Sequence, residues 1–141
     1  MTAGPGRDGT GAARTFALRV YYEDTDLAGI VYYANYLRFI ERARTEWVRA
    51  LGIDQVRLRA GRGIVFAVRR IVADYLAPAR FDDLIEVRTT LRDATGARIL
   101  LSQDILRGGE RLFAAEVTLV AIAAAGRPVR LPAELLAALR A

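Results

Sequence analysis

Two carboxylates separated by one residue come just before an amphipathic segment near the start of this 141-residue chain. They are Asp24 and Asp26, in the polar segment 23–29. Residues 30–33 include no Ser, Thr, Asp or Asn to cap the helix that is expected to begin there. Its first N–H groups would then be free to bind an oxyanion at the positive end of the helix dipole. A carboxylate facing such a site suits acyl transfer, in which one group attacks and another stabilises developing negative charge.

The same residues also have a purely structural interpretation. An Asp-Thr-Asp run ahead of a helix is typical of turn and capping chemistry, in which Asp24 and Thr25 shape the loop. The nearby aromatic residues suit core packing as well as a substrate pocket; they are Tyr32, Tyr33, Tyr36 and Phe39. Taken alone, the residues leave both interpretations open.

Composition narrows the chemistry further. The chain has no His, no Cys and no Lys, and Ser102 is its one serine. These absences exclude Ser–His and Cys–His nucleophiles, zinc sites built on His or Cys, disulfides and Schiff-base lysines. If the chain is an enzyme, its polar chemistry must come from Asp, Glu, Tyr, Thr, Asn, Arg and backbone groups.

The charge balance permits an anionic partner without establishing one. All 21 basic residues are Arg, against 16 acids, which gives a net charge of +5. Arginine is favoured for bidentate phosphate recognition, but a GC-rich genome also produces an all-Arg chain. No apolar run reaches 18 residues, so no membrane span is expected. We expect a cytoplasmic protein with a disordered tail at 1–14 and a single domain at 15–141.

The elements that must position these residues are one long helix and five strands. The helix is predicted from Val31 or Tyr32 to Leu51, because apolar residues recur there at helical spacing, and Gly52 follows as its C-terminal cap. The predicted strands are Phe16–Tyr22, Ile64–Ala73, Leu84–Arg92, Ala97–Arg107 and Glu110–Ala123, with a bend at Pro78, a hairpin turn at Gly108–Gly109 and a short helix opening at Pro132. One strand, one helix and then a four-stranded meander predict a two-layer α+β fold.

The segment Tyr21–Trp47 carries the motif Asp-x-Asp-x-x-Gly-x-Val-Tyr-x-x-Asn-Tyr, and Tyr75–Asp83 reads Tyr-Leu-Ala-Pro-Ala-Arg-Phe-Asp-Asp. With these motifs the chain resembles the 4-hydroxybenzoyl-CoA thioesterase family of hotdog-fold proteins, in particular its Tol-Pal-associated acyl-CoA thioesterase branch. The resemblance implies an antiparallel sheet wrapped around the long helix and a homodimer or homotetramer. It also implies hydrolysis of an acyl-CoA without metal or cofactor, and a possible functional link to the Tol-Pal system.

The resemblance also implies roles for individual residues. The family's catalytic carboxylate falls on Asp26, as nucleophile or general base, and its backbone oxyanion donor falls on Tyr33. Many relatives of the Tol-Pal branch have His where this chain has Tyr33, whereas 4-hydroxybenzoyl-CoA thioesterases have Tyr there. Gly29 either admits the substrate close to the backbone or serves as a simple turn glycine. Asn35 either binds the loop or faces solvent.

A coenzyme A substrate brings phosphates, for which Arg69, Arg70 and Arg98 are the candidate contacts; surface charge is the alternative. Glu41 is a second candidate carboxylate on the helix, or a solvated surface charge. A non-catalytic module that binds acyl-CoA or an acyl carrier protein is the competing function. Nucleic-acid binding ranks last, because acids alternate with the arginines and no nucleic-acid motif is recognised.

Overall fold

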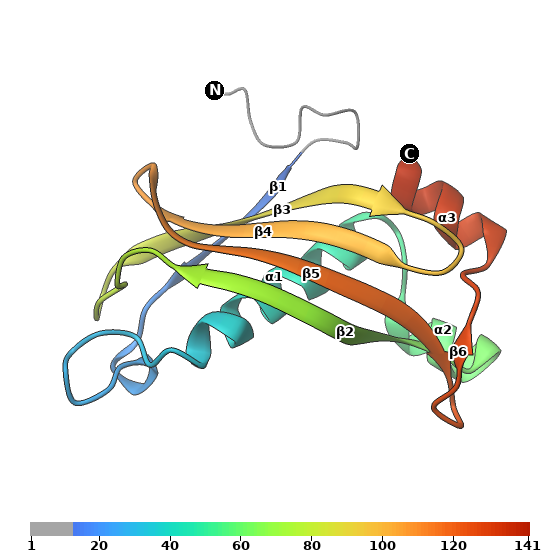
Figure 1. Ribbon diagram of the computed structural model, residues 1–141, viewed down its shortest axis with the longest axis horizontal. Helices are drawn as coiled ribbons and strands as arrows, with labels where there is room; N and C mark the ends of the chain where they lie inside the picture. The colour runs from blue at the N-terminus through green and yellow to red at the C-terminus, as the bar shows by residue number, and fades with distance from the viewer. Residues whose placement is uncertain (1–12) are drawn as a thin grey trace.

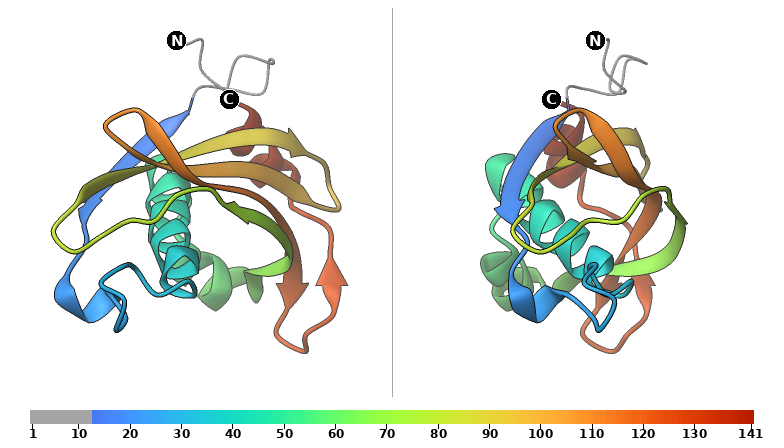
Figure 2. Two further views of the ribbon diagram at one scale, coloured as in Figure 1. Left: turned by 60° about the vertical axis from the view of Figure 1, so that its left-hand side comes forward. Right: turned by 90° about the vertical axis from the view of Figure 1, so that its left-hand side faces the viewer.

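In the computed structural model, residues 13–141 are described, and they form one curved antiparallel sheet that arches over a long helix (Figures 1 and 2). The sheet order is β1–β3–β4–β5–β2, with β6 beside the end of β5. The elements are β1 (Arg14–Arg19), the 3-10 turn η1 (Tyr22–Asp24), α1 (Asn35–Ala50), α2 (Gln55–Arg62), β2 (Ile64–Tyr75), β3 (Leu84–Ala94), β4 (Ile99–Arg107), β5 (Glu110–Ala123), β6 (Pro128–Val129) and α3 (Ala133–Arg140). The tail expected at 1–14 falls mostly outside the described residues.

This architecture confirms the expected α+β class and the sheet wrapped around one helix. The prediction of a four-stranded meander is wrong at one strand. Strands β3, β4 and β5 are consecutive neighbours, but β2 pairs with β5, from Ile64 opposite Ala123 to Tyr75 opposite Phe113. The chain therefore crosses the sheet between β2 and β3. Periodicity identifies a strand but carries no information on which neighbour it pairs with.

Helix α1 begins later than predicted, at Asn35 instead of Val31 or Tyr32. The preceding residues are held in extended backbone, because Val31 forms a β-bridge with Thr25 and donates its N–H to the Ala79 carbonyl at 2.8 Å. The helix ends as predicted, with Gly52 in the left-handed region at φ +85°. The helix residues buried against the sheet are Tyr36, Phe39, Ile40, Ala43, Trp47 and Val48.

The short helix α2 was not predicted from the sequence. Its first turn is capped by Asp54, whose carboxylate accepts the N–H of Arg57 at 3.1 Å, and it ends at Gly63 with φ +65°. Leu58 is its one buried residue. An eight-residue segment with so little apolar character gives almost no periodic signal, and its two caps are the features that could have revealed it.

A buried amide links α1 to the centre of the sheet. Gln103 on β4 is fully buried, and its Nε2 donates to the Ile40 carbonyl and to Thr89 Oγ1, both at 2.9 Å. Its Oε1 accepts from the Arg44 guanidinium at 2.9 Å. Burial lowers the pKa of Arg44, and the nearby charge of Glu41 offsets part of this shift. Gln103 thereby hydrogen-bonds with groups from both α1 and β3, and its own buried amide is satisfied.

We expect the substitution Gln103→Leu to lower the free energy of unfolding by about 1–3 kcal/mol, because it removes the buried acceptor of Arg44. Urea denaturation followed by circular dichroism measures this change. The neighbouring substitution Ser102→Ala, on the opposite face of the same strand, should change stability by less than ~0.5 kcal/mol. Equal stability of Gln103→Leu and wild type would contradict the role assigned to the amide.

Candidate active site

The segment between β1 and α1 folds into a hairpin with a tight turn at Asp26–Gly29. Thr25 bridges to Val31, the N–H of Asp26 donates to the Ile30 carbonyl at 2.9 Å, and the N–H of Gly29 donates to the Asp26 carbonyl at 2.9 Å. Gly29 has φ +81°, a conformation that side chains disfavour, although an added Cβ would meet nothing within 4 Å. The turn conformation is therefore sufficient to account for Gly29.

The Asp26 carboxylate lies exposed at this turn. Its Oδ1 accepts the N–H of Ala28 at 2.9 Å, and among residues 13–141 no donor contacts its second oxygen. The carboxylate acts electrostatically on the start of α1. Burial raises the pKa of Tyr36, and the negative charge of Asp26 raises it further, against the lowering effects of a backbone hydrogen bond and of Arg107. Asp26 thus lies within electrostatic range of the first turn of the helix.

Asp24 and Asn35 hold the hairpin against the helix start. The Asp24 carbonyl accepts the N–H of Tyr32 and the side-chain amide of Asn35, each at 2.9 Å. The Asp24 carboxylate accepts the N–H of Tyr21 at 2.8 Å, and Thr25 Oγ1 donates to the Tyr22 carbonyl at 2.7 Å. These contacts are consistent with a loop-shaping role for Asp24 and Thr25, and of the two alternatives for Asn35 the structure has the hydrogen bond to the loop.

The start of α1 carries two N–H groups without a protein acceptor. Ala34 is the N-cap residue, and no side chain caps the helix. Within the described part of the chain, the N–H groups of Tyr33 and Ala34 have no hydrogen-bond partner. The Tyr32 carbonyl accepts the N–H of Asn35 at 2.8 Å, so the N–H of Tyr33, on the opposite side of the same trans peptide, points away from that bond.

The aromatic residues divide between the core and the surface. Tyr36 and Phe39 are buried, and Tyr36 stacks on Phe113 with ring centroids 5.2 Å apart while its hydroxyl accepts the N–H of Ala79 at 2.9 Å. Tyr32 and Tyr33 are 46% and 63% exposed, and their rings approach to 4.9 Å. The neighbouring Tyr33 hydroxyl is the largest influence on the pKa of Tyr32, and it raises that pKa. Core packing therefore explains only half of this set.

Two residues at this site were missed in the sequence. The hydroxyl of Tyr75, the last residue of β2, donates to the Tyr33 carbonyl at 2.9 Å. Arg107, the last residue of β4, donates to the Asp83 carboxylate at 2.7 Å and to the Pro78 carbonyl at 3.2 Å. Burial raises the pKa of Asp83, but the hydrogen bonds from the Arg80 backbone and from Arg107 outweigh it and lower the pKa overall. Neither Tyr75 nor Arg107 belongs to a local spacing pattern that indicates a role at this site.

The arginines predicted to bind phosphates lie apart from Asp26 in the single chain. Arg98 follows β3 in the turn to β4, which is at the opposite end of the sheet from the loop after β1 (Figure 1), and its guanidinium is 3.8 Å from the Asp93 carboxylate. Arg69 and Arg70 are exposed midway along β2, where the register with β5 shifts. Their role in binding stays a prediction.

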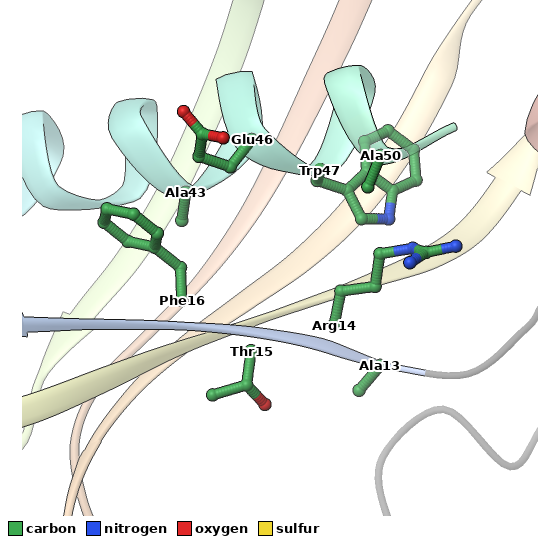
Figure 3. Close-up of a pocket in the computed structure, with 8 residues that line it drawn as sticks. All are labelled: Ala13, Arg14, Thr15, Phe16, Ala43, Glu46, Trp47 and Ala50. Atoms are coloured by element: carbon green, nitrogen blue, oxygen red, sulfur yellow. The ribbon is translucent and has the colours of Figure 1, made fainter. Parts of the chain in front are cut away.

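Among the hollows that border α1, two lie between the helix and the sheet. One, of about 220 Å³, lies between α1 and the β2–β5 side of the sheet and is lined by Glu41, Arg44, Thr45, Val48, Gln55, Phe66, Val68 and Leu119. Glu41, the second candidate carboxylate, thus faces this hollow. The other, of about 550 Å³, lies between β1 and the C-terminal half of α1, where Phe16 points toward Ala43 (Figure 3). Neither hollow is lined by Asp26 or Tyr33.

Within residues 13–141, no helix has the length and apolar character needed to cross a membrane. The same described residues contain no group of three His, Cys, Asp or Glu side chains placed to hold a metal ion. The polar groups that lie at the hairpin and the start of α1 are the Asp26 carboxylate, the open N–H groups of Tyr33 and Ala34, and the hydroxyls of Tyr32, Tyr33 and Tyr75.

Comparisons with known proteins identify similar sequences and similar folds. The acyl-CoA thioesterase YbgC of Haemophilus influenzae is 41% identical over 125 residues, which cover 88% of this chain and 92% of that protein. The crystal structure of a probable thioesterase from Bartonella henselae superposes with a TM-score of 0.83 at 39% identity, covering 86% of this chain and all of the other.

A more distant structure, a mutant 4-hydroxybenzoyl CoA thioesterase complexed with 4-hydroxybenzoyl CoA, superposes with a TM-score of 0.85 at 23% identity. It covers 92% of this chain and 99% of its own, and it shows the shared fold. Residues 20–139 match the sequence profile of the thioesterase-like superfamily. The match spans the hairpin, α1 and the whole sheet from β2 onward. The chain therefore belongs to the thioesterase-like superfamily and has the hotdog fold that its sequence resembles.

Proposed function

We propose that this protein hydrolyses an acyl-CoA thioester to a free acid and coenzyme A. The name of the Haemophilus influenzae relative supports the substrate class, since that protein is 41% identical over most of the chain. The observation that carries the proposal is local. The hairpin bearing the exposed Asp26 carboxylate is hydrogen-bonded through Asp24 to a helix start whose Tyr33 N–H has no acceptor in the described residues.

In the proposed mechanism the thioester carbonyl oxygen accepts a hydrogen bond from the N–H of Tyr33. This donor, near the positive end of α1, stabilises the negative charge that develops on the oxygen. Asp26 either attacks the carbonyl carbon, expelling coenzyme A thiolate to give a mixed anhydride that water then hydrolyses, or removes a proton from the attacking water. Both routes consume one water and give the same acid and thiol.

The neighbouring residues take supporting roles in this proposal. Gly29 presents backbone without a side chain beside Asp26, and the open space on its Cβ side leaves room for a substrate. Asn35 holds the helix start to the loop through the Asp24 carbonyl. Because the donor at Tyr33 is a backbone N–H, the Tyr in place of the His of many relatives leaves that donor intact.

A second subunit fits the free edge of the sheet. In the described residues β2 pairs on one side with β5 and has no neighbour on the other. Along this edge Val68 and Val72 are 43% and 44% exposed. An unpaired, partly apolar edge strand favours pairing with another chain. We propose a homodimer joined along β2, with a homotetramer as its further assembly.

A cytoplasmic location and a functional link to the Tol-Pal system remain predictions from the sequence.

We expect Asp26→Asn to lower kcat for acyl-CoA hydrolysis by ~10²–10⁴-fold, since the amide neither attacks nor removes a proton efficiently. Release of free thiol from short, long and aromatic acyl-CoAs measures the rate. The control Glu23→Gln removes an exposed charge from the same loop and should stay within about twofold of wild type. A wild-type protein that binds acyl-CoA without releasing thiol would be a binding module instead.

We expect neutralisation of the phosphate-binding arginines to raise KM and leave kcat nearly unchanged, because they contact the same phosphates in the ground and transition states. The variants are Arg98→Gln and the double variant Arg69→Gln/Arg70→Gln, with Arg57→Gln on the exposed surface of α2 as control. Steady-state kinetics measure both constants. If KM stays at the wild-type value in both variants, the proposed phosphate contacts are wrong.

We expect the wild-type protein to have two or four times the mass of one chain in solution, and the double variant Val68→Asp/Val72→Asp to shift toward monomer. Negative charges along a shared edge would face each other across the interface. Light scattering after size-exclusion chromatography measures the mass. The control Val56→Asp alters a residue of α2 that is 79% exposed and should leave the mass unchanged. A monomeric wild type contradicts this assembly.

A further inference from the structure

We propose that Tyr75 is a positioning residue: its hydroxyl fixes the peptide between Tyr33 and Ala34, so that the open N–H of Ala34 keeps the direction needed to bind the oxyanion as a second donor beside the N–H of Tyr33. This proposal rests on the proposed thioesterase function. Nothing in the mechanism above uses Tyr75, and its side chain comes from β2, which is remote from the hairpin in sequence.

The contact that carries the proposal is a single hydrogen bond between distant segments. The Tyr75 hydroxyl donates to the Tyr33 carbonyl at 2.9 Å across 42 residues of sequence. Burial raises the pKa of Tyr75, and the neighbouring hydroxyls of Tyr33 and Tyr36 raise it further. The hydroxyl therefore stays protonated at neutral and mildly alkaline pH, and it remains a donor over the range in which the enzyme is assayed.

One side of the Tyr75 ring packs against the core while the residue is 48% exposed, and this packing gives its hydroxyl a defined direction. Its centroid lies 5.0 Å from the Phe113 ring and 5.3 Å from the Tyr36 ring, edge to face in both cases, and 6.4 Å from the Tyr33 ring. Phe113 and Tyr36 are buried, with 0% and 3% exposure. These are the separations at which aromatic pairs attract each other. The packing therefore restricts the ring while leaving the hydroxyl at the surface of the site.

The backbone of Tyr75 is equally well fixed. Tyr75 opposite Phe113 is the last pair of the β2–β5 ladder, and the next two N–H groups, of Leu76 and Ala77, both donate to the Leu112 carbonyl. Two residues further on, the N–H of Ala79 donates to the Tyr36 hydroxyl. Hydrogen bonds to β5 therefore fix the backbone at Tyr75 and at the two residues that follow it. The hydroxyl of Tyr75 in turn fixes the Tyr33 carbonyl relative to the sheet.

The consequence for the oxyanion site follows from peptide geometry. In the trans peptide the Ala34 N–H points opposite to the Tyr33 carbonyl that Tyr75 holds. The preceding peptide is fixed in the same way, because the Tyr32 carbonyl accepts the N–H of Asn35. A hydrogen bond to the Tyr33 carbonyl also polarises that peptide and strengthens its N–H as a donor. Two adjacent N–H groups are therefore oriented by two different carbonyl bonds.

The substitution Tyr75→Phe tests the proposal, since it keeps the ring against Phe113 and Tyr36 and removes only the hydroxyl. Loss of an entire oxyanion donor costs ~10²–10³-fold in kcat, so misdirection of a retained donor should cost about tenfold. KM should stay within about twofold, and the loss should be the same for every acyl chain length, because the oxyanion is common to all substrates. The thermal midpoint should change by less than ~2 °C.

The matched control is Tyr22→Phe, which removes an exposed hydroxyl at the same end of the molecule. Tyr22 is 80% exposed, its ring contacts Phe81, and its hydroxyl has no hydrogen-bond partner in the described residues. Its kcat and thermal midpoint should match wild type. Three outcomes would each overturn the positioning role. The first is a tenfold loss of kcat in Tyr22→Phe as well, the second is a wild-type kcat in Tyr75→Phe, and the third is a Tyr75→Phe variant in which only KM is changed.

Amide chemical shifts separate this proposal from the proposed function. In Tyr75→Phe the ¹⁵N–¹H signals of Ala34 and, next to it, Tyr33 should shift, while those of Ala43 and Trp47 in the middle of α1 stay in place. Unchanged signals at Tyr33 and Ala34 overturn the positioning role whether or not the wild type hydrolyses thioesters. A wild type without thioesterase activity but with the shifted signals would overturn the proposed function alone.

Discussion

The constraint on which the site depends is the uncapped start of α1. A helix leaves its first N–H groups without intrahelical partners, and here no side chain supplies the missing acceptor. The structure instead anchors the helix start through its other groups. Asn35 binds the Asp24 carbonyl, the Tyr36 hydroxyl accepts the Ala79 N–H, and Tyr75 binds the Tyr33 carbonyl. Three chain segments thus converge on one helix end and leave its free donors exposed to a ligand.

Part of this arrangement could be predicted because it is encoded locally. The helical stripe of α1, the Gly52 cap and the Gly108–Gly109 turn each depend on residues a few positions apart, and all three are found in the structure. Asp26, Gly29 and Asn35 could be singled out because they lie in one short motif. The overall wrapping of the sheet came from the resemblance of that motif to a family.

The remainder depends on contacts between residues far apart in sequence. Helix α1 begins at Asn35 because residues 25–31 pair with one another and with Ala79, which propensity alone does not reveal. The position of β2 beside β5 depends on a crossover of the chain between β2 and β3, which the periodicity of the sequence does not reveal. In the sequence, Tyr75 lies beyond the predicted strand end at Ala73 and enters only as the first residue of the motif Tyr75–Asp83. Its link to Tyr33 exists because β2 ends where α1 begins.

The Gln103 amide has a consequence for how the chain is made. Its partners on α1, Ile40 and Arg44, precede it by 63 and 59 residues. The ribosome releases α1 well before β4, the strand that carries Gln103. The apolar face of the helix therefore stays without its sheet while some sixty residues are synthesised. Contacts of such long sequence separation form late and slowly. During that interval the nascent helix is a surface that a chaperone must shield or that a neighbouring nascent chain can capture.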